Sequence, residues 1–245
     1  MFDLNQILFG VYPYIALAVL VIGSVIRFDR EPYSWRTGSS QLLRRRQLVT
    51  GSILFHLGIL MIFGGHFVGL LTPVVVWDTL GISHGFKQMI AIVLGGFAGA
   101  ICLVGGLLLL HRRLFDARIR RNSSFGDTAI LIVLMAQLSL GLVSILVSLE
   151  HRDGHEMVKF MNWAQGVFTF QPGVANHIAD VHWIFKAHIV LGLTIFLAFP
   201  FTRLVHMLSA PIWYLNRRGW QLVRSKRRMP LDRTSKVPPH LRERT

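Results

Sequence analysis

The sequence predicts an all-α integral membrane protein that crosses the bilayer with five transmembrane helices. The 245 residues are 52% hydrophobic, and their mean hydropathy is +0.49. Only 16% of the residues are charged, whereas a soluble domain usually carries about 25%. The chain also contains five near-continuous apolar runs of about 20 residues, which is the length that a helix needs to cross the hydrocarbon core.

The five predicted spans follow one another along the chain with polar connections between them. Their expected bounds are residues 7–26, 49–71, 88–110, 128–149 and 181–201. The first is expected to be a retained span rather than a cleaved signal peptide, because the leader MFDLNQ has no basic residue and no small-x-small cleavage site follows. The second and fifth runs contain histidines, and the third begins directly after Lys87.

Positive charge is concentrated in three segments of the chain. The net charge is +14, and segments 27–48, 111–126 and 203–245 hold 22 of the 26 lysine and arginine residues. Basic loops stay on the cytoplasmic side of a membrane, so the N-terminus is expected outside and the C-terminus in the cytoplasm. The charge is therefore interpreted as topological, with adhesion to anionic membrane lipid, and no nucleic-acid partner is expected.

Histidines are the main ionisable side chains at depth in the predicted spans. All twelve Asp and Glu residues lie at span ends or in connections, which weighs against a proton- or ion-coupled transporter. His56, His66 and His188 lie at depth, and His206 follows the fifth span. One such histidine is readily explained by hydrogen bonding between helices, whereas four on two helices favour a ligand site. The single cysteine, Cys102, excludes a cysteine-ligated iron–sulfur cluster and a covalently attached haem.

The depths of these four histidines predict two pairs. At about 1.5 Å per helical residue, His56 lies about 10 Å from the inner end of the second span and His66 about 7 Å from its outer end. On the fifth span, His188 lies near the outer face and His206 at the inner face. His66 is therefore expected to pair with His188, and His56 with His206. Two such pairs predict two b-type haems between helices 2 and 5, because haem takes two axial nitrogens from the protein, whereas free zinc takes four ligands.

Two features of the fifth span bear on this pairing. His56 and His66 are about 15 Å apart along their helix, whereas His188 and His206 would be about 27 Å apart on a straight one. Pro200 is expected to reduce this mismatch by kinking the helix. His182 competes with His188 as the ligand, although it lies about 9 Å closer to water.

Six stretches carry a resemblance to a known family: YPYIA (12–16), YSWRTGSSQLL (33–43), FHLGILMIFGGHFVGLLTP (55–73), GGLLLLHRRLF (105–115), WAQGVFTF (163–170) and IFKAHIVLGLTIFLAFPFTRLVH (184–206). Over residues 10–217 the chain resembles the cytochrome b (gamma) subunit of membrane-bound respiratory nitrate reductase. The resemblance implies five spans, axial haem ligands at His56, His66, His188 and His206, and quinol oxidation near the outer haem. It also implies a bacterial or archaeal cytoplasmic (inner) membrane.

The resemblance implies an electron path and partner subunits. Electrons are expected to pass from quinol through the outer and then the inner haem to an iron–sulfur subunit on the cytoplasmic face. A molybdenum subunit then reduces nitrate, and protons are released outside. The inner loops 27–46 and 111–127 are expected either to dock these partners or to be simply solvated. Residues 1–223 are expected to form the di-haem domain, and residues 224–245 a basic cytoplasmic tail that is disordered or partner-bound.

The sequence suggests further site residues, and for some of them two roles remain open. Lys87 is expected either to donate a hydrogen bond to quinol, which the resemblance supports, or to extend to the membrane interface. Gly65 and Gly69 are expected to leave room for the quinol ring. Three arginines at inner span ends are expected either to pair with haem propionates or to anchor the spans: Arg112, Arg113 and Arg203.

Other functions also remain open at the level of the sequence. The first alternative is the equivalent cytochrome b subunit of a sulfur-metabolising, heterodisulfide-reductase-like complex. The second is a metal- or haem-handling transporter, which would usually need mid-membrane acids that the spans lack. The third is an anchoring subunit without a redox role, which leaves the four histidines unexplained.

Overall fold

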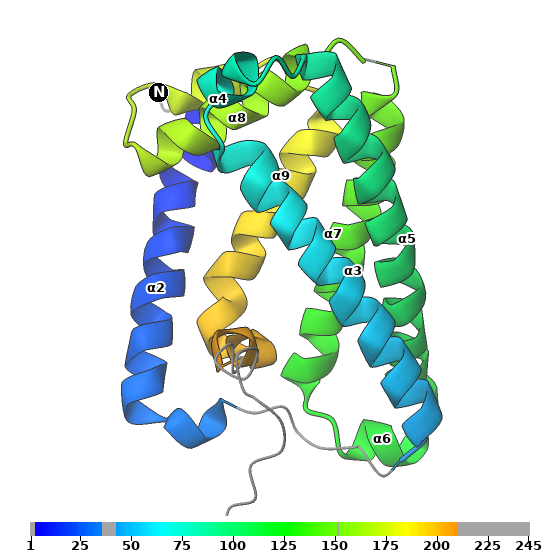
Figure 1. Cartoon of the computed structure of the whole chain (residues 1–245). Helices are drawn as coiled ribbons and strands as arrows, with labels where there is room; N and C mark the ends of the chain where they lie inside the picture. Colours follow the sequence, from blue (N-terminus) through cyan, green and yellow to red (C-terminus); the bar gives the residue numbers. More distant parts are fainter. Residues whose placement is uncertain (1–2, 36–42, 151, 210–245) are drawn as a thin grey trace, which may run out of the picture. The chain divides into compact units, whose positions relative to one another are not determined.

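The computed structural model describes residues 3–35, 43–150 and 152–209, and within these ranges it contains helices and connecting segments but no strand (Figure 1). Residues 36–42 of the first basic loop lie outside the described residues. The same holds for residues 210–223, at the end of the predicted membrane domain, and for the predicted tail 224–245.

Five of the described helices are long and apolar enough to cross a membrane, which confirms the predicted all-α class with five candidate spans. The first combines α1 (Leu4–Gln6), the π-helical turn η1 (Ile7–Val11) and α2 (Tyr12–Arg30). The next three are single helices: α3 (Arg45–Leu71), α5 (His84–Phe115) and α7 (Phe125–Ser148). The last combines α9 (Trp183–Ala198) and the 3₁₀ turn η4 (Phe199–Phe201).

The observed ends of the spans differ from the apolar runs by a few residues. α3 begins at Arg45 and α5 continues to Phe115, beyond the expected ends. Basic residues continue a helix here because their long side chains can reach the polar headgroup region. α9 begins later than expected because His182 is its N-cap, with its side chain accepting a hydrogen bond from the Ile184 N–H at 3.3 Å. This cap accounts for His182 without a ligand role.

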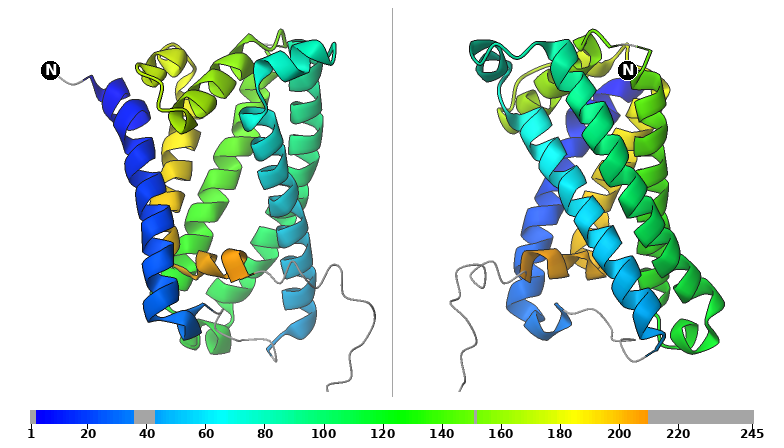
Figure 2. Two further views of the ribbon diagram at one scale, coloured as in Figure 1. Left: turned by 60° about the vertical axis from the view of Figure 1, so that its left-hand side comes forward. Right: turned by 45° about the vertical axis from the view of Figure 1, so that its right-hand side comes forward.

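The spans pack in the order α3, α5, α7, α9 and α2 (Figures 1 and 2). α3 approaches α5 closely because Gly58 has no side chain; a Cβ there would lie 2.7 Å from the Ala98 carbonyl oxygen. Only 6% of the apolar stretch of α3 is buried, compared with 22% to 28% in the other spans. α3 therefore presents a broad apolar surface that the rest of the described chain does not cover.

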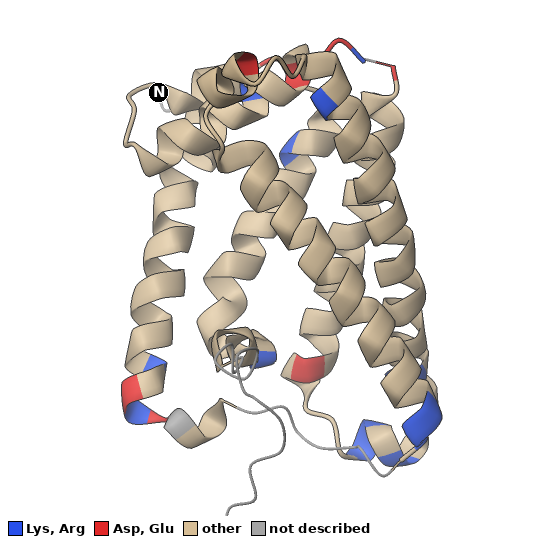
Figure 3. Cartoon of the chain, in the orientation of Figure 1, with Lys and Arg blue, Asp and Glu red and all other residues tan. Residues whose placement is uncertain are grey.

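Shorter elements cover the two ends of the bundle (Figure 1). One end, called the α8 end, contains the N-terminal turn and α4 (Val74–Thr79), α8 (His155–Phe168) and η3 (Val174–Ile178). The other, called the α6 end, contains η2 (Pro32–Ser34), α6 (Ala117–Arg121) and η5 (Arg203–Ser209). The basic residues that flank the spans gather mostly at the α6 end (Figure 3).

The α8 end has a hydrophobic core of its own, which the apolar runs did not predict. Trp163 of α8 packs there with Phe9, Ala175 and Ile178. The Trp163 indole Nε1–H donates to the Phe9 carbonyl at 3.0 Å and ties α8 to the first span. α8 is an amphipathic helix whose apolar face is too short to cross a membrane, so it covers the ends of the spans instead.

Candidate haem sites and the lysine beside them

Four histidines from two regions of the chain form two pairs. The ring centroids of His66 on α3 and His188 on α9 are 6.2 Å apart, with 35° between the ring planes. The ring centroids of His56 on α3 and His206 on η5 are also 6.2 Å apart, with 72° between the planes. The structure thus brings together the residues that the sequence pairs by depth, and the role of these pairs as ligands stays a prediction.

A break in the fifth span brings His206 to the level of His56. The α-helix ends at Ala198, Pro200 lies in the short turn η4, and η5 then runs across the base of α9 (Figure 2). Proline cannot continue the helical hydrogen bonding and favours such a break. Because η5 does not descend along the axis of α9, the separation of about 27 Å that a straight helix would impose does not apply.

Contacts from two other spans hold this broken segment. The Arg27 guanidinium on α2 donates to the carbonyl oxygens of Pro200 at 2.6 Å and Thr202 at 2.8 Å. Arg203 of η5 forms an ion pair with Asp127 of α7, with 3.2 Å between Nε and Oδ1. Arg27 thus bonds to carbonyl groups at the end of the fifth helix, where carbonyls lack intrahelical partners.

Three of the four imidazoles are oriented by a carbonyl of their own helix or turn. Nδ1 of His56 lies 2.7 Å from the Ser52 oxygen, and Nδ1 of His66 lies 2.8 Å from the Ile62 oxygen. Nδ1 of His206 lies 2.5 Å from the Arg203 oxygen. A carbonyl accepts only, so these bonds put the proton on Nδ1 and leave the Nε2 lone pair available to a metal. Metal-bound histidines are commonly held in this way.

The donor set fits haem better than a metal ion without a macrocycle. Among the described residues, no group of three or more His, Cys, Asp or Glu side chains lies close enough together to hold a metal ion. Each pair therefore offers two nitrogens, as haem iron requires, and falls short of the four ligands of a zinc site. A metal–nitrogen bond of about 2 Å on each side, plus about 1 Å from each nitrogen to its ring centre, predicts centroids about 6 Å apart.

The exposed surface of α3 next to His66 is suited to a flat ligand. A Cβ added at Gly64, Gly65 or Gly69 would meet no atom within 4 Å. The neighbouring Phe67 is 69% exposed. This combination of missing side chains and apolar flanks allows a planar group to approach the helix backbone, as the sequence predicts for Gly65 and Gly69.

Lys87 lies close to this surface and is buried. Its side chain is in the first turn of α5, and the residue is 6% exposed, so the side chain packs against the protein instead of extending into solvent. Its role at the quinol stays a prediction. Nζ donates to the Gly69 carbonyl at 2.9 Å and contacts the Met161 sulfur at 2.7 Å. It also lies 4.5 Å from the centre of the Trp77 ring, a favourable cation–π position.

The three arginines predicted near haem propionates have partners within the chain. Arg112 Nη2 donates to the Leu43 carbonyl at 2.7 Å, and Arg113 Nη1 donates to the Asp127 carbonyl at 2.6 Å. Arg203 pairs with the carboxylate of Asp127. All three arginines lie at the α6 end.

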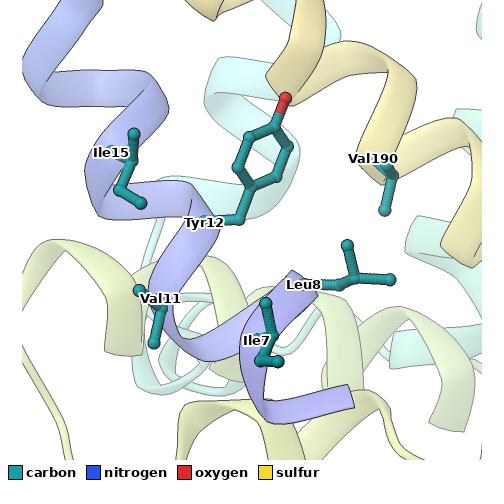
Figure 4. Close-up of a pocket in the computed structure, with 6 residues that line it drawn as sticks. All are labelled: Ile7, Leu8, Val11, Tyr12, Ile15 and Val190. Carbon is teal, nitrogen blue, oxygen red and sulfur yellow. The ribbon is translucent and has the colours of Figure 1, made fainter. Parts of the chain in front are cut away.

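The apolar pocket in Figure 4 lies apart from these residues. It has a volume of about 310 Å³ and lies between η1, α2 and α9. The hydroxyl of its Tyr12 is hydrogen-bonded to Thr194 Oγ1 at 2.9 Å. None of the predicted site residues lines it; the lining residues are Ile7, Leu8, Val11, Tyr12, Ile15 and Val190.

Comparison with known proteins settles the family. The sequence model of the nitrate reductase gamma subunit family matches residues 5–226. This chain belongs to the nitrate reductase gamma subunit family. The family consists of b-type cytochrome subunits of an oxidoreductase complex in which partner subunits carry out the catalysis, which confirms the resemblance.

Two Escherichia coli (strain K12) gamma chains are close relatives of this family member. The respiratory nitrate reductase 1 gamma chain is 48% identical over 223 residues, covering 91% of this chain and 98% of the relative. The respiratory nitrate reductase 2 gamma chain is 46% identical over 224 residues, with the same coverage. An Hdr-like menaquinol oxidoreductase cytochrome b-like subunit of Archaeoglobus profundus is more distant: 27% identical over 195 residues, covering 78% of this chain and 56% of the relative.

Several residues that shape the site of this gamma-family chain were missed in the sequence. The sequence pattern identifies Arg27 only as a topological charge, although it contacts Pro200. Nothing in the pattern connects Trp77 and Met161 with Lys87, because loops separate them in the chain. Gln137, near the middle of α7, contacts His188. A glutamine in the middle of an apolar span is a visible signal, because such a side chain needs a partner from another helix.

Proposed function

We propose that this chain is the quinol-oxidising, di-haem subunit of a nitrate reductase, and that it carries electrons from the α8 end to partner subunits at the α6 end. The observation that carries the proposal is the presence of two histidine pairs, each with ring centroids 6.2 Å apart, between the same two regions of the bundle. When bound, b-type haems supply the one-electron transfer between quinol and the partner subunits.

The four histidines are proposed to act as axial ligands. His66 and His188 would hold the haem nearer the α8 end, and His56 and His206 the haem nearer the α6 end. The bonds from Nδ1 of His56, His66 and His206 to backbone carbonyls keep Nε2 free to bind iron and fix the ring orientation. Arg112, Arg113 and Arg203 lie at the end of the bundle where propionates of the second haem would need cations.

The charges of the bundle support a proposed orientation in the membrane. Basic residues gather mostly at the α6 end (Figure 3), and basic segments stay on the cytoplasmic side. We therefore place the α6 end and the C-terminus in the cytoplasm and the α8 end outside. The membrane is inferred to be a bacterial or archaeal cytoplasmic membrane. The described basic loop at 111–127, with the flanks of the loop at 27–46, is the proposed docking surface for an iron–sulfur subunit and, through it, a molybdenum subunit.

Quinol is proposed to bind between Lys87 and the glycine-rich face of α3. A lysine ammonium has three N–H donors, and Gly69 and Met161 engage two of them. The third has no hydrogen-bond acceptor among the described residues, and we propose that it donates to an oxygen of the quinol. Gly65 and Gly69 leave space for its ring because a Cβ at either position would meet no atom within 4 Å.

The electron path conserves energy without a proton channel. Moving an electron toward a negative cytoplasm costs about 2.3 kcal/mol per 100 mV, and quinol oxidation has to drive this step. Protons released at the α8 end stay outside. No Asp or Glu lies centrally in the predicted spans, so this chain has no carboxylate relay that would carry protons back.

Nitrate is the proposed terminal acceptor, with the heterodisulfide-reductase-like complex as the second candidate. The relatives at 46% and 48% identity are gamma chains of nitrate reductases, whereas the Hdr-like relative is 27% identical. Identification of the subunits that co-purify with the chain distinguishes the two. A molybdenum subunit with nitrate reductase activity supports the first candidate, and a sulfur-metabolising partner supports the second.

The decisive experiment is a haem assay and optical spectrum of the purified membrane complex. Two low-spin b-type haems per chain, reduced by quinol and reoxidised by nitrate, are the expected result. A preparation of intact complex that contains one haem per chain, or none, contradicts the proposal.

A further inference from the structure

Gln137 of α7 contacts both the ring and the backbone of His188. Its side-chain Nε2 lies 3.3 Å from His188 Nε2 and donates to the His188 carbonyl oxygen at 3.0 Å. Among the described residues, His188 is the one predicted ligand of the four whose ring contacts a side chain from another span. A mid-span glutamine in such a contact has a specific rather than a solvating role.

Small residues on both helices make room for this contact. Gln137 and Gly141 lie one turn apart on α7, and His188 and Gly192 lie one turn apart on α9, so each pair shares a helix face. A Cβ at Gly141 would lie 3.0 Å from His188 Cε1, and a Cβ at Gly192 would lie 3.1 Å from Gln137 Nε2. Each polar side chain thus packs against the glycine of the opposite helix, and the two helices form a reciprocal fit.

Both partners have a buried polar atom that lacks a hydrogen bond. Within the described chain, Gln137 Oε1 and His188 Nδ1 are buried and have no partner. A neutral imidazole that gives one nitrogen to a metal must carry its proton on the other, and that N–H needs an acceptor. A glutamine amide contains both a donor and an acceptor, so it can serve either arrangement of the ring.

We propose that Gln137 is a positioning residue for His188. When the ring gives Nε2 to iron, the amide turns so that its unpaired Oε1 accepts from the Nδ1–H, the two atoms that lack partners in this structure. This inference rests on the proposed function, in which His188 is an axial ligand. An acceptor at the ligand N–H increases the basicity of the imidazole and stabilises the oxidised metal. Gln137 therefore lowers the midpoint potential of the haem held by His66 and His188 and leaves the other haem unaffected.

The test is a potentiometric optical titration of the complete complex in membranes. The component that disappears in His66→Ala is assigned to the outer haem. Gln137→Met, which keeps the length of the side chain and removes its polar atoms, is expected to raise the midpoint potential of that component alone. A tenfold change in the reduction equilibrium corresponds to about 59 mV for one electron. Gln137→Glu, which restores an acceptor oxygen, is expected to return the potential to the wild-type value or below it.

Ser144→Ala is the matched control, because within the described chain this α7 hydroxyl bonds to the Gly141 carbonyl of its own helix, at 2.7 Å, and not to His188. Unchanged potentials in Gln137→Met, or an equal shift of both haems, overturn the inference. If Gln137→Met loses the outer haem, Gln137→Glu is expected to restore it. Failure of Gln137→Glu to restore the haem also overturns the inference. A wild-type complex without two separately titrating haems would instead contradict the proposed function, so the two failures are distinguishable.

Discussion

The Arg27 guanidinium on α2 donates to the Pro200 carbonyl at 2.6 Å and so joins the first span to the turn at which the fifth helix is broken. A Cβ on Gly23, one helical turn before Arg27, would lie 2.8 Å from Pro200 Cγ, so the close approach of the two spans also depends on that glycine. Arg27 of α2 thus helps to position η5, the segment that contains His206, although α2 itself contributes none of the four histidines.

Arg27→Ala is expected to lose the haem at His56 and His206 and to keep the one at His66 and His188. The substitution removes charge-assisted hydrogen bonds worth about 1.5–3 kcal/mol each from the turn that precedes η5. The haem-to-chain ratio and the reduced optical spectrum measure the loss. Arg30→Ala, at an exposed position on the same helix, is the control. Equal loss of both haems would mean that Arg27 supports the whole bundle instead.

Substitutions within one histidine pair are expected to have the same effect. His56→Ala and His206→Ala should each remove the same spectral component, and His66→Ala and His188→Ala the other, because each pair has centroids 6.2 Å apart. Combining two changes from one pair should add no further loss. Redox titration of the four single variants tests this pairing, and a different grouping of the spectra would contradict it.

Lys87→Ala is expected to slow quinol-dependent haem reduction at least tenfold while both haems remain bound. The change removes the proposed donor to quinol, and a lost hydrogen bond to a charged group costs about 1.5–3 kcal/mol. Stopped-flow reduction by a quinol analogue measures the rate. Arg152→Ala removes an exposed positive charge at the same end of the bundle and should leave the rate unchanged. A wild-type rate in Lys87→Ala excludes the residue from the quinol site.

Gly65→Ala is expected to affect quinol binding, whereas Gly58→Ala is expected to affect folding. The added methyl at Gly65 meets no atom within 4 Å, so folding should be unaffected or slightly favoured, since alanine suits a helix better than glycine by about 1 kcal/mol. The KM for quinol should rise because the methyl enters the proposed quinol space. At Gly58 the methyl would lie 2.7 Å from Ala98 and Cys102, and reduced yield of folded protein is expected. Thermal stability and steady-state kinetics separate the two effects.

The ion pairs of Lys159 predict a pH dependence at the α8 end. Nζ lies 2.7 Å from Asp180 and 2.9 Å from Glu156. The hydrogen bond from Lys159 lowers the pKa of Asp180, and the bonds to Asp180 and Glu156 raise the pKa of Lys159. The stabilisation is therefore present above the unfolded pKa of Asp, about 3.9, and below that of Lys, about 10.4.

This contribution is lost as the pH falls through the lowered pKa of Asp180 or rises through the raised pKa of Lys159. Hydrogen exchange of α8 should accordingly be faster in Lys159→Met than in the wild type near neutral pH. The two should converge in strong acid, where Asp180 is protonated. If the difference in exchange rate between the variant and the wild type persists unchanged in strong acid, the effect comes from packing of the Lys159 side chain and not from its ion pairs.

The long apolar runs predicted the spans well because the hydrocarbon core imposes both helical structure and a length of about 20 residues. The depths of His56, His66 and His188 could likewise be counted along a helix, whereas His206 lies on η5, beyond the break in the fifth span. α8 was not predicted, because an amphipathic helix at a bundle end is shorter and less apolar than a span. The environments of Lys87 and Gln137 were not predictable either, since their partners Met161 and His188 come from distant parts of the chain.

The sequence alone determined that this chain has five candidate spans, that four histidines lie near them at two depths, and that its family is that of the nitrate reductase gamma subunits. These properties depend on composition, on the rise of a helix and on local motifs. Only the tertiary structure decided that η5 turns across the base of α9. The same holds for the contacts of Arg27 with Pro200, of Lys87 with Gly69 and of Gln137 with His188. Such contacts depend on how distant helices pack, and close packing at residues such as Gly58 and Gly192 is specified by the fold as a whole.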